Sequence, residues 1–102
     1  MKIEPFGPLV PMLYFKTFDE VIERANNHEL GLSSYICTNS MDKAYKASEL
    51  METGTVAVNT PLVAIAEAPF GGIKQSGYGR EGGSMAIKDY LNVKYTHLGL
   101  KG

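Results

Sequence analysis

Residues 33–59 read SSYICTNSMDKAYKASELMETGTVAVN, and this stretch decides the fold class. Residues 33–38 combine β-branched and aromatic side chains in a short bounded run, which is typical of a strand. Residues 55–59 form a second such run, and the residues between the two runs have an apolar face at helical spacing. A strand, a helix and a second strand in this order predict parallel pairing through a right-handed crossover. The fold class is therefore α/β.

A helix is predicted before this unit, over residues 18 to about 29. Thr17 and Glu20 form a capping box at its start: the Thr17 hydroxyl accepts from the Glu20 amide, and the Glu20 carboxylate reaches back. Gly31 is the expected stop. The apolar stripe of an amphipathic helix follows the cap, made of Phe18, Val21, Ile22 and Ala25.

The second helix lies between the two strands. Asn39 or Ser40 caps its start, and Gly54 ends it. We expect one face of it to pack on the strands, made of Met41, Ala44, Tyr45, Ser48 and Met51.

Both ends of the chain carry weaker signals. The apolar run Leu9 to Phe15 predicts a strand, and Pro11 inside it argues for an edge position or a bulge. The stretch that begins at Thr60 is rich in glycine and predicts a long irregular connection. A short helix is expected from Ser84 to Leu91. Residues 93–98 alternate in polarity, which predicts a final strand that pairs with something outside this chain.

Composition excludes several classes of protein. The chain has 102 residues, a formal net charge of −1 and 44% hydrophobic residues, which fits one globular domain. The charge balance favours neither a nucleic acid nor a membrane surface as a partner, and no apolar run is long enough to span a bilayer. The N-terminus lacks the apolar region of a signal peptide, and one cysteine with two distant histidines makes no recognisable zinc site. We expect a cytoplasmic location.

A glycine motif offers a possible phosphate site. Residues 77–82 match G-x-G-x-x-G, in which glycines let backbone amides approach a pyrophosphate. The motif needs a preceding buried strand and a following βαβ unit, and residues 74–76 do not form such a strand. The pattern therefore favours a glycine-rich surface connection.

Three further side chains could take part in chemistry. Cys37 lies within a predicted strand, with no histidine nearby to lower its pKa, so we expect a buried structural thiol. His28 lies near a helix end and His97 on the last predicted strand, and neither has a visible partner for acid–base catalysis. Judged from the residues alone, Glu4 is an ordinary terminal carboxylate presented by a Pro-Phe-Gly-Pro turn.

Two long motifs then resemble a known family. Residues 4–8 read E-P-F-G-P, and residues 68–82 read A-P-F-G-G-I-K-Q-S-G-Y-G-R-E-G. Both occur, in this order and at this spacing, in the C-terminal portion of NAD(P)-dependent aldehyde dehydrogenases. The resemblance covers essentially the whole chain, and residues 81–99 are most similar to succinate-semialdehyde dehydrogenases.

The resemblance implies roles for four residues. Glu4 would accept hydrogen bonds from the nicotinamide ribose, and Phe6 would pack beside the nicotinamide. Phe70 would be an aromatic wall of the aldehyde channel, and Ala64 a channel position that varies with the aldehyde. Related succinate-semialdehyde dehydrogenases often have a serine at the Ala64 position, so a more apolar aldehyde, or a carboxylate bound by another part of the protein, stays open.

The family also implies what the chain does not contain. Its nucleophilic cysteine, general base and dinucleotide-binding domain precede the E-x-F-G-P turn, and Cys37 does not match the catalytic motif. Residues 1–92 would be part of a catalytic domain and residues 93–102 an oligomerisation strand and tail. We expect the chain alone to bind neither NAD nor NADP and to oxidise no aldehyde.

Two interpretations stay open from the sequence. The chain is either a segment of an oxidoreductase that converts an aldehyde, with succinate semialdehyde as a candidate, to a carboxylic acid, or a truncated non-catalytic module that self-associates. Both predict a homo-oligomer, because apolar surface and an unpaired strand would otherwise face water.

Overall fold

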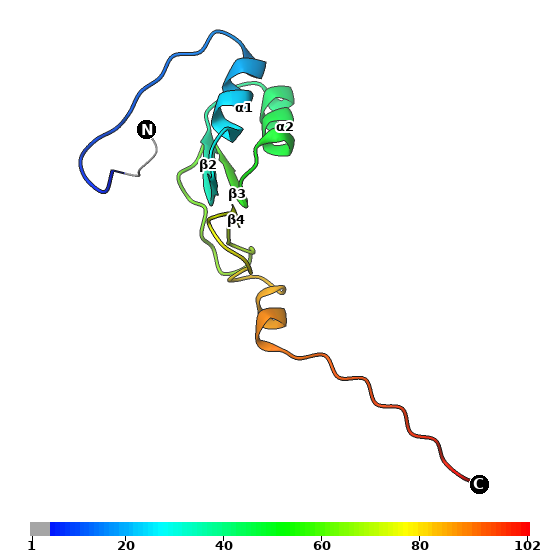
Figure 1. The fold of residues 1–102 in the computed structure, drawn as a ribbon. Coiled ribbons are helices and arrows are strands. Elements are labelled where there is room, and N and C mark those ends of the chain that lie inside the picture. The colour runs from blue at the N-terminus through cyan, green and yellow to red at the C-terminus, as the bar shows by residue number, and fades with distance from the viewer. Residues whose placement is uncertain (1–4) are drawn as a thin grey trace.

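The computed structural model describes residues 5–102. The elements run in the order α1 (Phe18–Asn26), β1 (Leu30–Gly31), β2 (Ser33–Ile36), α2 (Met41–Leu50), β3 (Thr55–Val58), β4 (Ile73–Lys74) and a short 3-10 helix, η1 (Ala86–Tyr90). Figure 1 shows a small α/β unit, α1 to β3, with an arm at each end of the chain. The radius of gyration is 19.3 Å, against about 13 Å for a compact domain of this length. The difference reflects the two arms.

The central prediction of a parallel strand pair is confirmed. β2 and β3 pair in parallel, from Ser33 opposite Thr55 to Ile36 opposite Val58, with α2 as the crossover. α1 and α2 lie beside one another next to these strands (Figure 1).

The core of the described chain is small and made of alanines. Ala44 and Ala47 of α2 and Ala57 of β3 are its buried apolar residues, between 4% and 8% exposed. The predicted face of α2 is therefore partly wrong, because Met41 and Tyr45 are 70% and 68% exposed. The residues of α2 that become buried are therefore its small ones, and its larger apolar side chains stay mostly exposed.

Local hydrogen bonds fix both helix starts. The Thr17 hydroxyl accepts from the Glu20 amide at 3.2 Å, and the Glu20 carboxylate accepts from the Lys16 amide at 2.9 Å. This confirms the cap, with the return bond one residue earlier than in a regular capping box. Mainly because of the Lys16 amide, and then the Arg24 side chain, the pKa of Glu20 is lowered. Ser40 is the cap of α2, and its hydroxyl accepts from the Lys43 amide.

Both helices end earlier than their glycines predict. α1 ends at Asn26, and α2 ends at Leu50, with Met51 as its cap. Gly31 is not a helix stop: it lies in β1, opposite Ile73 of β4 in a short antiparallel pair. A Cβ on Gly31 would come within 2.7 Å of the Glu52 carbonyl oxygen, so the close approach of the two backbones requires glycine.

The chain ends differ from the prediction in three places. Residues 9–15 form no strand, because no neighbouring strand offers them hydrogen bonds within residues 5–102. The expected helix at 84–91 is instead the 3-10 helix η1, which has no side-chain cap. Residues 93–98 run as part of an exposed extended arm without a paired strand, and their pairing with another chain stays a prediction (Figure 1).

Candidate functional site

A cavity of about 750 Å³ lies between the start of the described chain, β1, β2 and the glycine-rich loop, residues 60–83. Its size is within the range of small-molecule sites. Its lining is mainly apolar with a few polar groups: Pro5, Pro11, His28, Leu30, Leu32, Ser33, Tyr35, Val63, Phe70 and Ser76.

Phe70 is held at this cavity by its backbone. Its amide donates to the Glu81 carbonyl oxygen and its carbonyl accepts from the Glu81 amide, both at 2.7 Å. The Arg80 guanidinium donates to the Gly72 carbonyl at 2.8 Å and closes the same turn. The aromatic ring that the sequence assigns to an aldehyde channel is therefore placed on a cavity wall by paired hydrogen bonds.

Ala64 lies beside this cavity without lining it. The neighbouring Val63 is half-buried and faces the cavity, whereas Ala64 is exposed. The Leu62 amide donates to the Thr60 hydroxyl at 3.1 Å, which shapes the turn before them. The loop that contains Ala64 therefore reaches the cavity through Val63.

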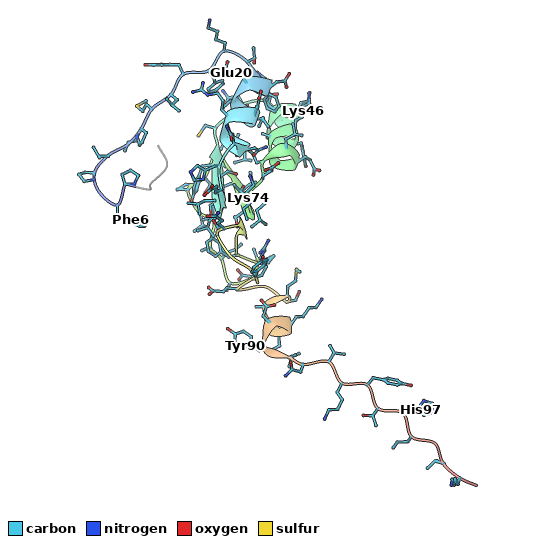
Figure 2. The ribbon with its side chains drawn as sticks, in the orientation of Figure 1. Phe6, Glu20, Lys46, Lys74, Tyr90 and His97 are labelled. Carbon is cyan, nitrogen blue, oxygen red and sulfur yellow. The ribbon has the colours of Figure 1, made fainter. Side chains whose placement is uncertain are left out.

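Of the two predicted cofactor residues, only Phe6 is within the described chain, where it lies in the N-terminal arm. Glu4 is outside the described residues, and its neighbour Pro5 lines the cavity. Phe6 is 95% exposed, and Figure 2 shows it apart from the α/β unit. The structure thus brings Phe70 to the cavity and leaves Phe6 in open solvent.

Two polar side chains of the cavity, those of His28 and Ser76, accept hydrogen bonds from backbone amides. His28 Nδ1 accepts from the Leu30 amide at 3.0 Å, and the Ser76 hydroxyl accepts from the Gly31 amide at 2.9 Å. In the neutral ring of His28 the proton is therefore on Nε2. These contacts fix the β1 side of the cavity and form no pair of nucleophile and base.

Cys37 is exposed, so the prediction of a buried thiol is wrong. β2 ends at Ile36, so Cys37 follows the strand rather than lying within it. It borders a second cavity, of about 610 Å³, which lies between α1, β2 and α2 and does not include Phe70. Within residues 5–102, no group of three metal-binding side chains comes together.

The glycine motif at 77–82 has no phosphate-binding context in the structure. Gly79 has a φ of 83°, and a Cβ there would lie 2.7 Å from the Asp89 carboxylate. The same carboxylate accepts from the Arg80 amide at 2.9 Å, and η1 takes the place of the required α-helix. The interpretation as a glycine-rich connection is confirmed. No helix among residues 5–102 has the length and apolar character to cross a membrane.

Sequence reasoning did not find the β1 side of the cavity. β1 and β4 are two residues long, and the residues that they pair are distant in the chain: Leu30 lies opposite Lys74 and Gly31 opposite Ile73. Two-residue strands carry no periodic signal. The sequence indicates only that the backbone of the A-P-F-G-G-I-K-Q-S-G motif needs hydrogen-bond partners. No residue pattern near the motif indicates that β1 supplies them.

Comparison with known proteins identifies the class of this chain. Residues 1–96 match the aldehyde dehydrogenase family, and the chain belongs to that family. The match extends over the α/β unit, the cavity and the glycine-rich loop.

Individual relatives are semialdehyde and sulfoaldehyde dehydrogenases. The chain is 50% identical over 96 residues to a 3-sulfolactaldehyde dehydrogenase of Pseudomonas putida, covering 94% of this chain and 20% of the relative. It is 44% identical over 99 residues to the NADP(+) succinate-semialdehyde dehydrogenase GabD of Escherichia coli, covering 97% and 20%. A crystal structure of an aldehyde dehydrogenase from Brucella melitensis superposes with a TM-score of 0.88 at 47% identity, over 93% of this chain and 20% of that one. The chain therefore spans about a fifth of the length of these relatives.

Proposed function

We propose that this chain forms the C-terminal part of the catalytic domain of an NAD(P)-dependent semialdehyde dehydrogenase. The observation that carries the proposal is the position of Phe70. The family motif that contains it is folded by its own hydrogen bonds, and the ring lies on an apolar cavity together with Val63, Leu32 and Tyr35. An apolar wall of this kind suits the hydrocarbon part of an aldehyde.

The proposed substrate is an aldehyde with an anionic group at its other end. The relatives are named for 3-sulfolactaldehyde, succinate semialdehyde and glutarate semialdehyde, and all three compounds have this feature. No lysine or arginine is among the described residues, 5–102, that line the cavity. In this proposal, therefore, residues outside this chain bind the anion, and Phe70 and Val63 cover the carbon chain between the two groups.

In this proposal, the chain provides only two of the residues that contact the cofactor, Glu4 and Phe6. Phe6, with its exposed ring, can pack on a nicotinamide, and Glu4 can accept from two ribose hydroxyls. The described residues form no cradle for the pyrophosphate, because η1 replaces the required helix. The nicotinamide supplies the hydride acceptor when bound, while this chain's part is to position its ring and to exclude water from one side of the aldehyde.

A hybrid enzyme tests the proposal. In the Escherichia coli succinate-semialdehyde dehydrogenase, the matching segment is replaced by this chain, and NADP+ reduction is followed with succinate semialdehyde and with butanal. Butanal is the matched control because it has the same carbon number and no charge. The hybrid should reduce NADP+ with the semialdehyde and prefer it by about tenfold or more in kcat/KM. A folded hybrid without activity, or one that prefers butanal, would contradict the proposal.

The arms favour a second proposal, that the chain self-associates. Val93, Tyr95 and Leu98 are between 80% and 102% exposed, and their backbone has no paired strand within residues 5–102. An extended segment of this kind can add to a sheet edge of another subunit. Sedimentation at micromolar concentration should show an oligomer of the chain. A monodisperse monomer of 11.1 kDa that binds no hydrophobic dye would rule out this proposal.

A further inference from the structure

Lys74 joins three parts of the molecule that are distant in sequence. Its ammonium donates to the carbonyl oxygens of Asn26 at 2.9 Å and His28 at 3.2 Å, and it forms an ion pair with Glu52. An ammonium has three donors, and here each has an acceptor. The side chain is 26% exposed, so these contacts are partly shielded from water. Figure 2 labels Lys74 where the α/β unit meets the glycine-rich loop.

The residues that bind Lys74 are themselves fixed. The Asn26 side chain donates to the Leu50 carbonyl at 2.7 Å and accepts from the Glu52 amide at 2.8 Å, so it ties the end of α1 to the end of α2. Asn26 is the last residue of α1, where carbonyl groups lack helical partners and a cation is favourable. We name Asn26, Glu52 and Lys74 the clamp.

The clamp lies behind the candidate cavity. Lys74 is opposite Leu30 in the β1–β4 pair, and Leu30 lines the cavity, as does Ser76, two residues after Lys74. The His28 carbonyl oxygen accepts from Lys74, and His28 also lines the cavity. The Gln75 amide donates to the Glu29 carbonyl at 3.0 Å and completes the join. Movement of Lys74 would therefore move the β1 side of the cavity relative to Phe70.

We infer that Lys74 is a positioning residue for the aldehyde site: by holding the ends of α1 and α2 against β4, it sets the distance between the His28–Leu30 wall and the Phe70 wall. This inference rests on the function proposed above. Lys74 has a φ of 55°, so a flexible unbranched replacement such as methionine leaves the backbone requirement unchanged and removes the ammonium with its charge and its three donors.

Kinetics of the hybrid enzyme test the inference with Lys74→Met, Lys74→Arg and the control Lys46→Met. Lys46 is a matched control because it is an exposed lysine of α2, outside the clamp and both cavities. Lys74→Met should raise KM for the aldehyde about tenfold and leave KM for NADP+ and kcat within about twofold. Lys74→Arg should recover most of the loss, because a guanidinium can donate to the same three acceptors. Equal changes in both KM values, no rescue by arginine, or an aldehyde KM no different from that of Lys46→Met would overturn the inference.

Amide hydrogen exchange of the full chain separates this inference from the proposed function. In Lys74→Met, the amides of Gly31 and Gln75 should exchange about tenfold faster than in Lys46→Met, while the amides inside α2 do not change. An inactive wild-type hybrid would contradict the proposed function alone, and this exchange result would still decide whether Lys74 holds the cavity wall. Unchanged exchange at both amides would overturn the inference even in an active hybrid.

Discussion

The α/β unit and the two arms differ in where their hydrogen-bond partners come from. In the unit, β2 pairs with β3, and only α2 separates the two strands in the sequence. Both helix starts are capped by neighbouring side chains. The arms, residues 5–16 and 91–102, also contain many apolar residues, with Tyr14 and Leu100 both more than 90% exposed, but they lack a paired strand within residues 5–102. Apolar composition alone therefore does not form an element, because the backbone also needs a partner. In the function proposed here, that partner is the rest of the enzyme.

A charge in the small alanine core should break the unit. Ala57→Asp places a carboxylate at a position that is 6% exposed, which should cost about 3 kcal/mol of unfolding free energy. Urea unfolding followed by circular dichroism measures the cost. Leu100→Asp, on the C-terminal arm and outside residues 93–98, is the control and should change the free energy by less than about 0.5 kcal/mol. If both variants behaved alike, the distinction between unit and arms would be lost.

Removal of the Asn26 side-chain hydrogen bonds, which join the ends of α1 and α2, should lower the unfolding free energy by an intermediate amount. Asn26→Ala loses the hydrogen bonds to Leu50 and Glu52, of 2.7 and 2.8 Å, and should lower the unfolding free energy by about 1–2 kcal/mol. Asn92→Ala on the C-terminal arm is the matched control and should have no measurable effect on the urea midpoint. A midpoint for Asn26→Ala that equals the wild-type value would show that α1 and α2 do not depend on this bond.

The smallest effect concerns acid stability of the α1 start. The folded pKa of Glu20 is lowered, first by the Lys16 amide and then by Arg24. A carboxylate whose pKa is lower in the folded chain stabilises that chain at a pH above the ordinary carboxylate pKa, near 4.5. This contribution is lost as the pH falls through the lowered pKa of the folded chain. Glu20→Gln cannot titrate, so its stability should fall less steeply than that of the wild type below about pH 4.5. Parallel curves of thermal midpoint against pH would argue against this role.

The elements that the sequence predicted correctly are those specified by neighbouring residues. The predicted strands at 33–38 and 55–59 are observed as Ser33–Ile36 and Thr55–Val58, and of the two predicted caps, Asn39 and Ser40, the structure has Ser40. All three features depend on residues close in the chain. The predicted packing face of α2 was partly wrong, because helical spacing alone does not show that Ala44 and Ala47 become buried while Tyr45 stays exposed.

The candidate site depends more on contacts between distant residues. The motif around Phe70 could be recognised from its own residues, whereas the opposite wall at His28 and Leu30 forms only when β1 meets β4. Lys74 stands in that motif, yet its three acceptors come from the ends of two helices. Such contacts have no periodicity in sequence, so no local pattern could have predicted them.

Amide hydrogen exchange of the N-terminal arm tests most directly the claim that the rest of a semialdehyde dehydrogenase completes this chain. The amides of residues 9–15 are compared in the isolated chain and in the hybrid with the Escherichia coli enzyme, with the interior of α2 as the reference. The account predicts that these amides exchange at least about a hundredfold more slowly in the hybrid, because they gain strand partners there. Equal exchange in the two proteins, with the α2 reference protected in both, would contradict it.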